Sequence, residues 1–79
     1  MTVEQLKKIL ESMGITQVEI FKGMFVTSIR VNPLVYWLDY RFGKKLEEMG
    51  GHERLAWNSD YEREVWFNGG IVVQYRSAI

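Results

Sequence analysis

Cysteine is absent from this chain, and histidine and proline occur once each among its 79 residues. Without cysteine there can be no disulfide, no thiolate nucleophile and no cysteine-ligated zinc site. The one histidine, His52, follows two glycines, and no serine lies in a nucleophile-elbow sequence, so a catalytic triad has no basis. Neither clustered metal ligands nor a glycine-rich phosphate loop is present. We therefore expect no metal, no cofactor and no enzymatic activity.

Paired carboxylates are the remaining source of chemistry in the sequence. Glu62 and Glu64 lie two residues apart on one face of a predicted strand, a spacing that glycosidase-like chemistry could in principle use. Exposed strand faces carry such pairs routinely, and a domain of this size has little wall with which to enclose a substrate. We interpret the pair as ordinary surface.

Long hydrophobic runs are also absent. No apolar stretch approaches the roughly 18 residues that cross a bilayer. The first five residues lack the basic and apolar character of a secretion signal. We expect no membrane association and a cytoplasmic location.

Net charge is missing as well, because ten Lys and Arg balance ten Asp and Glu. Nucleic-acid affinity comes mostly from basic side chains on phosphates, so a neutral chain is a poor candidate for it. The charges are unevenly spread: residues 1–45 carry seven basic and four acidic side chains, and residues 46–79 carry three basic and six acidic ones. Such an asymmetry could steer a partner, but we favour the simpler interpretation that it is a chance feature of a solvated surface.

The stretch from Asn32 to Gly51 has the strongest pattern. Asn32-Pro33 is a helix-start signal, because Asn caps free N–H groups and Pro fits the first helical position. A pair of glycines at residues 50–51 supplies a left-handed C-cap. On a helical wheel of the residues between these two signals, one third of the circumference is apolar. The residues of this stripe are Leu34, Val35, Leu38, Phe42, Leu46 and Met49. The alternative, a strand over residues 34–42, would be largely apolar on both faces and would not explain Leu46 or Met49. We therefore predict one long helix.

A shorter helix and a hairpin precede this stretch. Thr2-Val3-Glu4-Gln5 is a capping box, an apolar face follows at helical spacing, and Gly14 ends the helix. Residues 15–31 then predict a hairpin around Lys22-Gly23, with Phe21 opposite Met24. Because Lys-Gly is a weak turn signal, a loop of four residues stays an alternative to a loop of two.

Three further strands are predicted after the long helix. Residues 53–57 form a short strand with Leu55 and Trp57 on one side, and Asn58-Ser59-Asp60 is turn chemistry. Residues 61–67 and 71–76 form a hairpin, for which a three-residue loop separates apolar from polar faces better than a two-residue loop. The predicted pairs are Phe67–Ile71, Val65–Val73, Arg63–Tyr75, Trp66–Val72, Glu64–Gln74 and Glu62–Arg76.

These elements give one α+β domain over residues 1–79 in the order α-β-β-α-β-β-β. The simplest arrangement is a two-layer sandwich with two helices on one face of an antiparallel sheet. The other face of an antiparallel sheet can stay open to water. How the first strand pair joins the last three strands stays open.

Two sets of large side chains are left outside the predicted core. The set on the open sheet face is Trp66, Val72, Phe21, Met24 and Val26, and the set on the outer side of the long helix is Tyr36, Trp37, Tyr40 and Arg41. Aromatic, Met and Arg side chains are enriched at protein interfaces, and exposed apolar patches on a small protein indicate a partner. The alternative is that these side chains cover helix flanks or fill a second layer. We expect them to bind a protein partner.

Two functions fit these residues. The first is a protein-binding module, an inhibitor or adaptor that docks on a larger protein and that could also self-associate. The second is a single-stranded nucleic-acid-binding module that stacks bases on Trp66 or Tyr61 and binds phosphates through arginines. The nearby Glu62 and Glu64 would repel those phosphates, so we favour the protein partner. In size and layout the chain resembles small proteins of phages and mobile elements, among them inhibitors of host defence, and this likeness of type favours an inhibitor over an adaptor.

Overall fold

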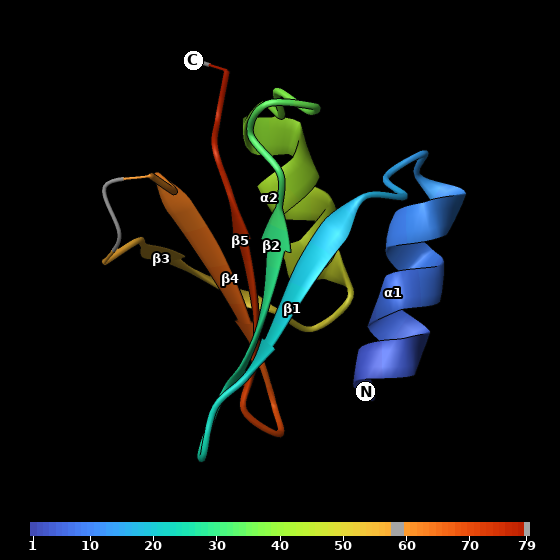
Figure 1. Ribbon diagram of the computed structural model, residues 1–79, viewed down its shortest axis with the longest axis vertical. Helices are drawn as coiled ribbons and strands as arrows, with labels where there is room; N and C mark the ends of the chain where they lie inside the picture. Colours follow the sequence, from blue (N-terminus) through green and yellow to red (C-terminus); the bar gives the residue numbers. More distant parts are fainter. Residues whose placement is uncertain (58–59, 79) are drawn as a thin grey trace.

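The computed structural model describes residues 1–57 and 60–78, and in these residues it contains two helices and a five-stranded sheet (Figure 1). The elements are α1 (Val3–Ser12), β1 (Val18–Lys22), β2 (Thr27–Val31), α2 (Tyr40–Glu48), β3 (His52–Leu55), β4 (Arg63–Phe67) and β5 (Ile71–Tyr75). The predicted α+β class and the order of the elements are therefore confirmed.

The sheet has the strand order β1-β2-β5-β4-β3. The pairs β1–β2, β3–β4 and β4–β5 are antiparallel, whereas β2 and β5 run parallel. The sheet is thus mixed rather than wholly antiparallel, which corrects one detail of the prediction. The parallel pair arises because the chain leaves β2, passes through α2 to the far edge of the sheet, and folds back twice until β5 fills the gap beside β2.

Both helices contribute to one apolar layer on a single face of the sheet. In the view of Figure 1, α2 lies behind the strands and α1 lies beside β1. Phe42 of α2 meets Tyr75 of β5 edge-to-face, with ring centroids 4.8 Å apart. The buried layer consists of Leu6, Leu10, Ile15, Ile29, Val31, Phe42, Leu46, Val65, Phe67, Ile71, Val73 and Tyr75.

Local signals set three of the four helix ends as predicted. The side chain of Thr2 accepts a hydrogen bond from Gln5 N at 3.1 Å, and Gln5 Oε1 accepts from Thr2 N at 2.8 Å, which completes the capping box of α1. Gly14 follows α1 with φ 84°, and Gly50 follows α2 with φ 104°. The residue after each glycine donates back to a carbonyl of the last helical turn, at 2.9 Å to Leu10 and 3.1 Å to Leu46, as expected for a glycine C-cap.

The start of α2 differs from the prediction, because the helix begins at Tyr40 and not at Asn32. Asn32 Oδ1 accepts from Leu34 N at 2.9 Å, and the Asn32 carbonyl accepts from Tyr36 N at 3.1 Å, but this turn does not continue. Leu38 instead forms a parallel bridge with Ser77, beyond the end of β5. The predicted apolar stripe is therefore wrong over its first half, and Leu34 is 91% exposed.

The first hairpin has the longer of the two loops considered. Lys22 pairs with Thr27, and Gly23 N donates to the Val26 carbonyl at 2.8 Å, so four residues form the turn. Relative to a two-residue loop, the pairing shifts by four residues, an even number that leaves each side chain of the strands on its predicted face. Met24 is therefore in the turn and not opposite Phe21 as predicted.

The last hairpin has the predicted register, including the pairs Trp66–Val72 and Glu64–Gln74. Gly69 and Gly70 both have positive φ in its turn, at 91° and 74°. The Glu62–Arg76 ion pair is not among the ion pairs of the described residues, and Arg76 Nε donates to the Asp60 carbonyl at 3.0 Å. Strand β3 ends at Leu55, so Trp57 lies beyond it, and the predicted turn at Asn58-Ser59 falls outside the described residues.

Candidate functional site

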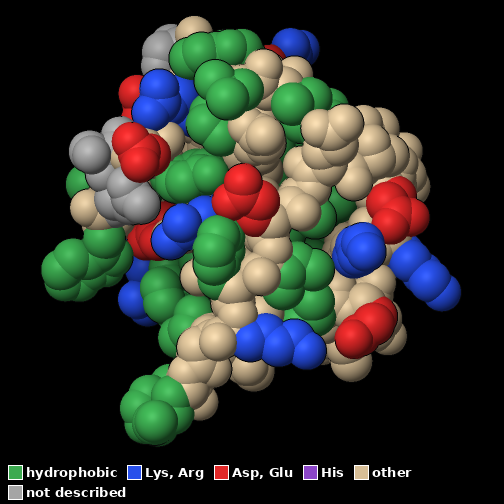
Figure 2. Space-filling model, in the orientation of Figure 1, with side chains coloured by type: hydrophobic (Ala, Val, Ile, Leu, Met, Phe, Trp, Pro, Cys, Tyr) green, Lys and Arg blue, Asp and Glu red, His purple; other side chains and the backbone are tan. Residues whose placement is uncertain are grey.

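The sheet face that the helices leave free carries two rows of side chains, which the strand registers define. The first row is polar, and runs Glu19, Arg30, Gln74, Glu64, Arg54 from β1 to β3. The second row is mostly apolar, and runs Phe21, Ser28, Val72, Trp66, His52. We refer to this surface as the open face. Figure 2 shows hydrophobic side chains interleaved with Lys, Arg, Asp and Glu on the side of the molecule away from α2.

Hydrogen bonds link three members of the polar row. Arg30 Nε donates to Gln74 Oε1 at 2.8 Å, and Gln74 Nε2 donates to Glu64 Oε2 at 2.7 Å. Glu64 is only 2% exposed although no helix covers it, because long neighbouring side chains lie over the strands. Its other oxygen, Oε1, is buried without a hydrogen-bond partner in the described part of the chain. The open face is thus partly closed by its own side chains.

Arginines lie over the aromatic rings of the open face. The Arg30 guanidinium lies 4.4 Å from the ring centroid of Phe21 and 5.5 Å from that of Tyr61, and the Arg54 guanidinium lies 5.2 Å from that of Trp66. These distances are in the range of cation–π attraction. A base could stack on these rings only by displacing the guanidinium groups, so the open face does not resemble a bare stacking platform.

The residues predicted on the open face differ in their exposure to solvent. Val72 is buried and belongs to the sheet interior, and Trp66 and Val26 are half-buried. The indole Nε1 of Trp66 is buried and has no hydrogen-bond partner among the described residues. Only Phe21 and Met24 keep a large exposed apolar surface.

The sequence pattern also missed the exposure of Phe25. The four-residue turn places Phe25 at the end of the hairpin, where it is 85% exposed. The sequence signal that could have predicted this exposure is the weakness of Lys-Gly as a two-residue turn. Met24, beside it in the turn, is 90% exposed.

Phe21, Met24 and Phe25 together form what we call the apolar tip. They lie at the β1–β2 turn, the lower end of the molecule in Figure 1, where a hydrophobic side chain projects in Figure 2. The neighbouring β4–β5 turn supports the tip, because Thr27 N donates to the Gly70 carbonyl at 2.7 Å. A Cβ on Gly70 would overlap or crowd the Phe25 carbonyl, so the two turns are in close backbone contact.

The second predicted set does not form one face of a helix. The hydroxyl of Tyr36 donates to the Gly14 carbonyl at 3.2 Å and accepts from Thr16 N at 3.1 Å, so it joins the connection before α2 to the end of α1. Hydrogen bonds with Thr16 hold the pKa of Tyr36 below its ordinary value. Trp37 is exposed, and the Arg76 guanidinium lies 5.8 Å from the centroid of its indole ring.

The other two members of that set lie at the start of α2. Tyr40 is the first residue of the helix and is half-exposed, and Arg41 makes a 2.6 Å ion pair with the N-cap residue Asp39. The hydrogen bond from Arg41 holds the pKa of Asp39 below its ordinary value. Whether Tyr36, Trp37, Tyr40 and Arg41 bind a partner stays a prediction.

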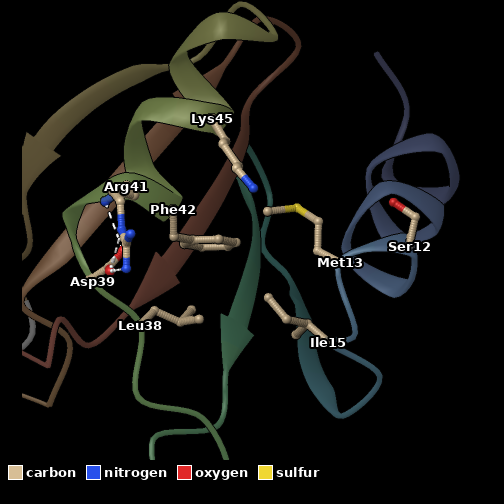
Figure 3. A pocket seen from close by; sticks show the side chains of 8 residues that line it. All are labelled: Ser12, Met13, Ile15, Leu38, Asp39, Arg41, Phe42 and Lys45. Atoms are coloured by element: carbon tan, nitrogen blue, oxygen red, sulfur yellow. Dashed lines mark hydrogen bonds and ion pairs between the residues drawn. The ribbon is translucent and has the colours of Figure 1, made fainter.

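A groove of about 510 Å³ lies between the end of α1 and the start of α2 (Figure 3). We call it the interhelix groove. It is lined by Ser12, Met13 and Ile15 on one side and by Leu38, Asp39, Arg41, Phe42 and Lys45 on the other. The side chain of Lys45 extends across the groove toward Met13 in Figure 3.

Comparison with known proteins does not favour any of these surfaces. The chain matches no protein-family model, no curated protein and no solved structure. Within residues 1–57 and 60–78, no three His, Asp or Glu side chains are grouped as metal ligands. Neither helix of the described chain has the length and apolar character needed to cross a bilayer. Function must therefore be inferred from the surfaces themselves.

Proposed function

We propose that the chain is a small protein-binding module that docks on a larger protein through the apolar tip, Phe21, Met24 and Phe25. The observation that carries the proposal is the exposure of Met24 and Phe25, at 90% and 85%, in a chain that buries Phe42 and Phe67, the two phenylalanines outside the tip. Contiguous exposed apolar side chains on a small domain usually mark an interaction site. Aromatic anchors that fill a partner's pocket typically dominate the binding energy.

The surroundings of the tip favour binding with little loss of conformational freedom. Arg30 lies over the ring of Phe21, and its Nε is bonded to Gln74, so the arginine is itself held in place. The β1–β2 turn rests on the β4–β5 turn through the Thr27–Gly70 hydrogen bond. Because fewer side chains and backbone angles need to be ordered on association, more of the contact energy remains as affinity.

The chemistry of the tip defines the class of partner. It presents methionine and phenylalanine beside the guanidinium of Arg30, which makes no ion pair with any described residue. The complementary surface is an apolar pocket on a larger protein with a carboxylate at its rim. An apolar projection of this kind acts by occupying that pocket, as an inhibitor or adaptor in the cytoplasm would, and not by chemistry of its own.

A photo-cross-linking experiment tests the proposal. The photoreactive amino acid p-benzoylphenylalanine replaces Phe25 in one protein and Lys7, on the exposed side of α1, in a control protein. In extract of cells that carry the gene, we expect a discrete protein adduct from position 25 and none from position 7. Excess unlabelled wild type should abolish the adduct, whereas the double variant Met24→Ser, Phe25→Ser should not.

Other results would contradict docking at the tip. Equal adducts from positions 25 and 7 would mean that contact is not specific to the tip. An adduct whose mass is twice that of the chain would identify self-association. Adducts that disappear after nuclease treatment, with binding that falls steeply as salt is added, would favour the nucleic-acid function instead.

A further inference from the structure

We propose that the interhelix groove binds a lipophilic carboxylate, with the apolar tail on Met13, Ile15, Leu38 and Phe42 and the carboxylate on the ammonium of Lys45. This is a small-molecule site, separate from docking at the apolar tip. Strand β2 separates the two, because the tip precedes Thr27 at one end of the strand and the segment leading to Leu38 follows Val31 at the other (Figure 1).

The groove has the size and the apolar floor of a ligand site. Its volume of about 510 Å³ falls within the range of roughly 300–1,000 Å³ usual for small-molecule pockets. Ile15 and Phe42 are nearly fully buried and form the floor, while Met13 and Leu38 are half-buried and form the walls. Figure 3 shows these four side chains converging on the same space. A tail placed there would remove both its own surface and that of the walls from water.

The charges at the rim select the sign of the head group. Asp39 and Arg41 also line the groove, but their 2.6 Å ion pair neutralises both. Lys45 makes no ion pair with any residue in the described part of the chain, and its side chain extends over the groove. One uncompensated cation above an apolar floor is complementary to a singly charged anion with an apolar tail.

A phosphate group fits the same place less well than a carboxylate. The start of α2 cannot serve as an anion site, because the Asp39 side chain already accepts from Arg41 N at 3.0 Å and places a carboxylate at the helix N-terminus. With Asp39 and Arg41 paired to each other, a dianion would have only the single charge of Lys45 to balance its two charges. A monocarboxylate needs only the ammonium of Lys45.

Lys44 provides a matched control for Lys45. The two lysines are adjacent on α2, but Lys44 does not line the groove and lies instead by a shallow hollow with Glu47 and Glu48. Both are exposed, so their substitution should leave the fold intact. A general effect of removing one positive charge from α2 should appear in both the Lys44 and the Lys45 variants. An effect that depends on the groove should appear only in the Lys45 variant.

The test is a titration with octanoate and with 1-octanol, each below its aggregation concentration, followed by the methyl resonances of Met13, Ile15 and Leu38. We expect saturable shifts at these methyls and tighter binding of octanoate than of octanol. Lys45→Met should weaken octanoate binding about twofold to fivefold, the range of one exposed ion pair, and should leave octanol binding unchanged. Lys44→Met should change neither. Lys45→Glu should reverse the preference, so that octylammonium binds more tightly than octanoate.

Three results would overturn the proposal. The first is a set of shifts that do not saturate, or that are as large at the exposed methyls of Leu34 and Leu55 as at the groove. The second is an equal effect of Lys45→Met and Lys44→Met on octanoate binding. The third is a shift of the groove methyls when the protein concentration alone is raised. The last would assign the groove to a second copy of the chain. The Met24→Ser, Phe25→Ser protein should bind octanoate as the wild type does, so failure at the groove and failure at the tip are told apart.

Discussion

At the scale of single residues, Gly43 marks the closest approach of α2 to the sheet. A Cβ at this position would overlap the hydroxyl oxygen of Tyr75, whereas the nearest ring carbon of that residue would lie at a normal 3.4 Å. Tyr75 is completely buried, so its side chain has no room to move aside and relieve the overlap. The glycine is therefore required by packing and not by backbone conformation.

The contact predicts opposite effects of one substitution in two backgrounds. Gly43→Ala should destabilise the wild type by about 1–3 kcal/mol, as overpacking does. With Tyr75→Phe the obstructing oxygen is gone, and the same change should stabilise by up to about 1 kcal/mol, the helix preference of Ala over Gly. Urea unfolding of the four proteins in a double-mutant cycle measures the coupling. If Gly43→Ala has the same effect in both backgrounds, the hydroxyl is not what excludes a side chain at position 43.

At the scale of elements, two residues compete to cap α2. Asn32 and Asp39 are both good N-cap residues, and each has a side-chain oxygen that accepts from the N–H two residues later, at 2.9 and 3.0 Å. Only Asp39 precedes a helix. The difference lies outside the local sequence: Leu38 N donates to the Arg76 carbonyl at 3.3 Å, which keeps residue 38 extended and forces the helix to begin after it.

Substituting the two caps separates these roles. Asp39→Ala should lower the free energy of unfolding by about 0.5–2 kcal/mol, the usual cost of losing an N-cap, and Asp39→Asn should retain most of the stability. Asn32→Ala affects only an exposed turn and should change stability by less than about 0.5 kcal/mol. Helix content by circular dichroism and urea midpoints provide the measurement. A larger loss from Asn32→Ala than from Asp39→Ala would mean that the helix of the free protein starts at residue 33.

The same elements show which parts of the fold and of the site the sequence could predict. The capping box, the glycine C-caps and the register of the β4–β5 hairpin depend on residues a few positions apart, and these predictions are confirmed. The start of α2 depends on the distant Ser77, to which no local pattern points. For the site, alternation placed Phe21 on the open face, but only the turn length exposes Phe25, and side chains of other strands bury Val72.

At the scale of the whole molecule, the pairing of β2 with β5 joins the two ends of the chain. These strands are separated by about half the sequence. Both carry buried apolar side chains on the helix-covered face, and Ile29 of β2 lies opposite Val73 of β5. Hydrophobic pattern alone cannot select this neighbour, because any strand with one apolar face would satisfy it. Once formed, the pair places the α1–β1–β2 segment and the β3–β4–β5 segment in one sheet and over one core.

A core substitution at this junction should therefore unfold both segments together. Ile29→Ala should cost about 2–5 kcal/mol, because it removes buried methyl and methylene groups and leaves a cavity between the sheet and the helices. Far-UV circular dichroism reports the helices, and tryptophan fluorescence reports residues 37, 57 and 66; the two urea transitions should coincide and shift equally. The Met24→Ser, Phe25→Ser control alters only exposed side chains and should shift the midpoint by less than about 0.5 kcal/mol in free energy. Separate transitions for the two signals would mean that the chain folds as two units, and that the parallel pair does not couple them.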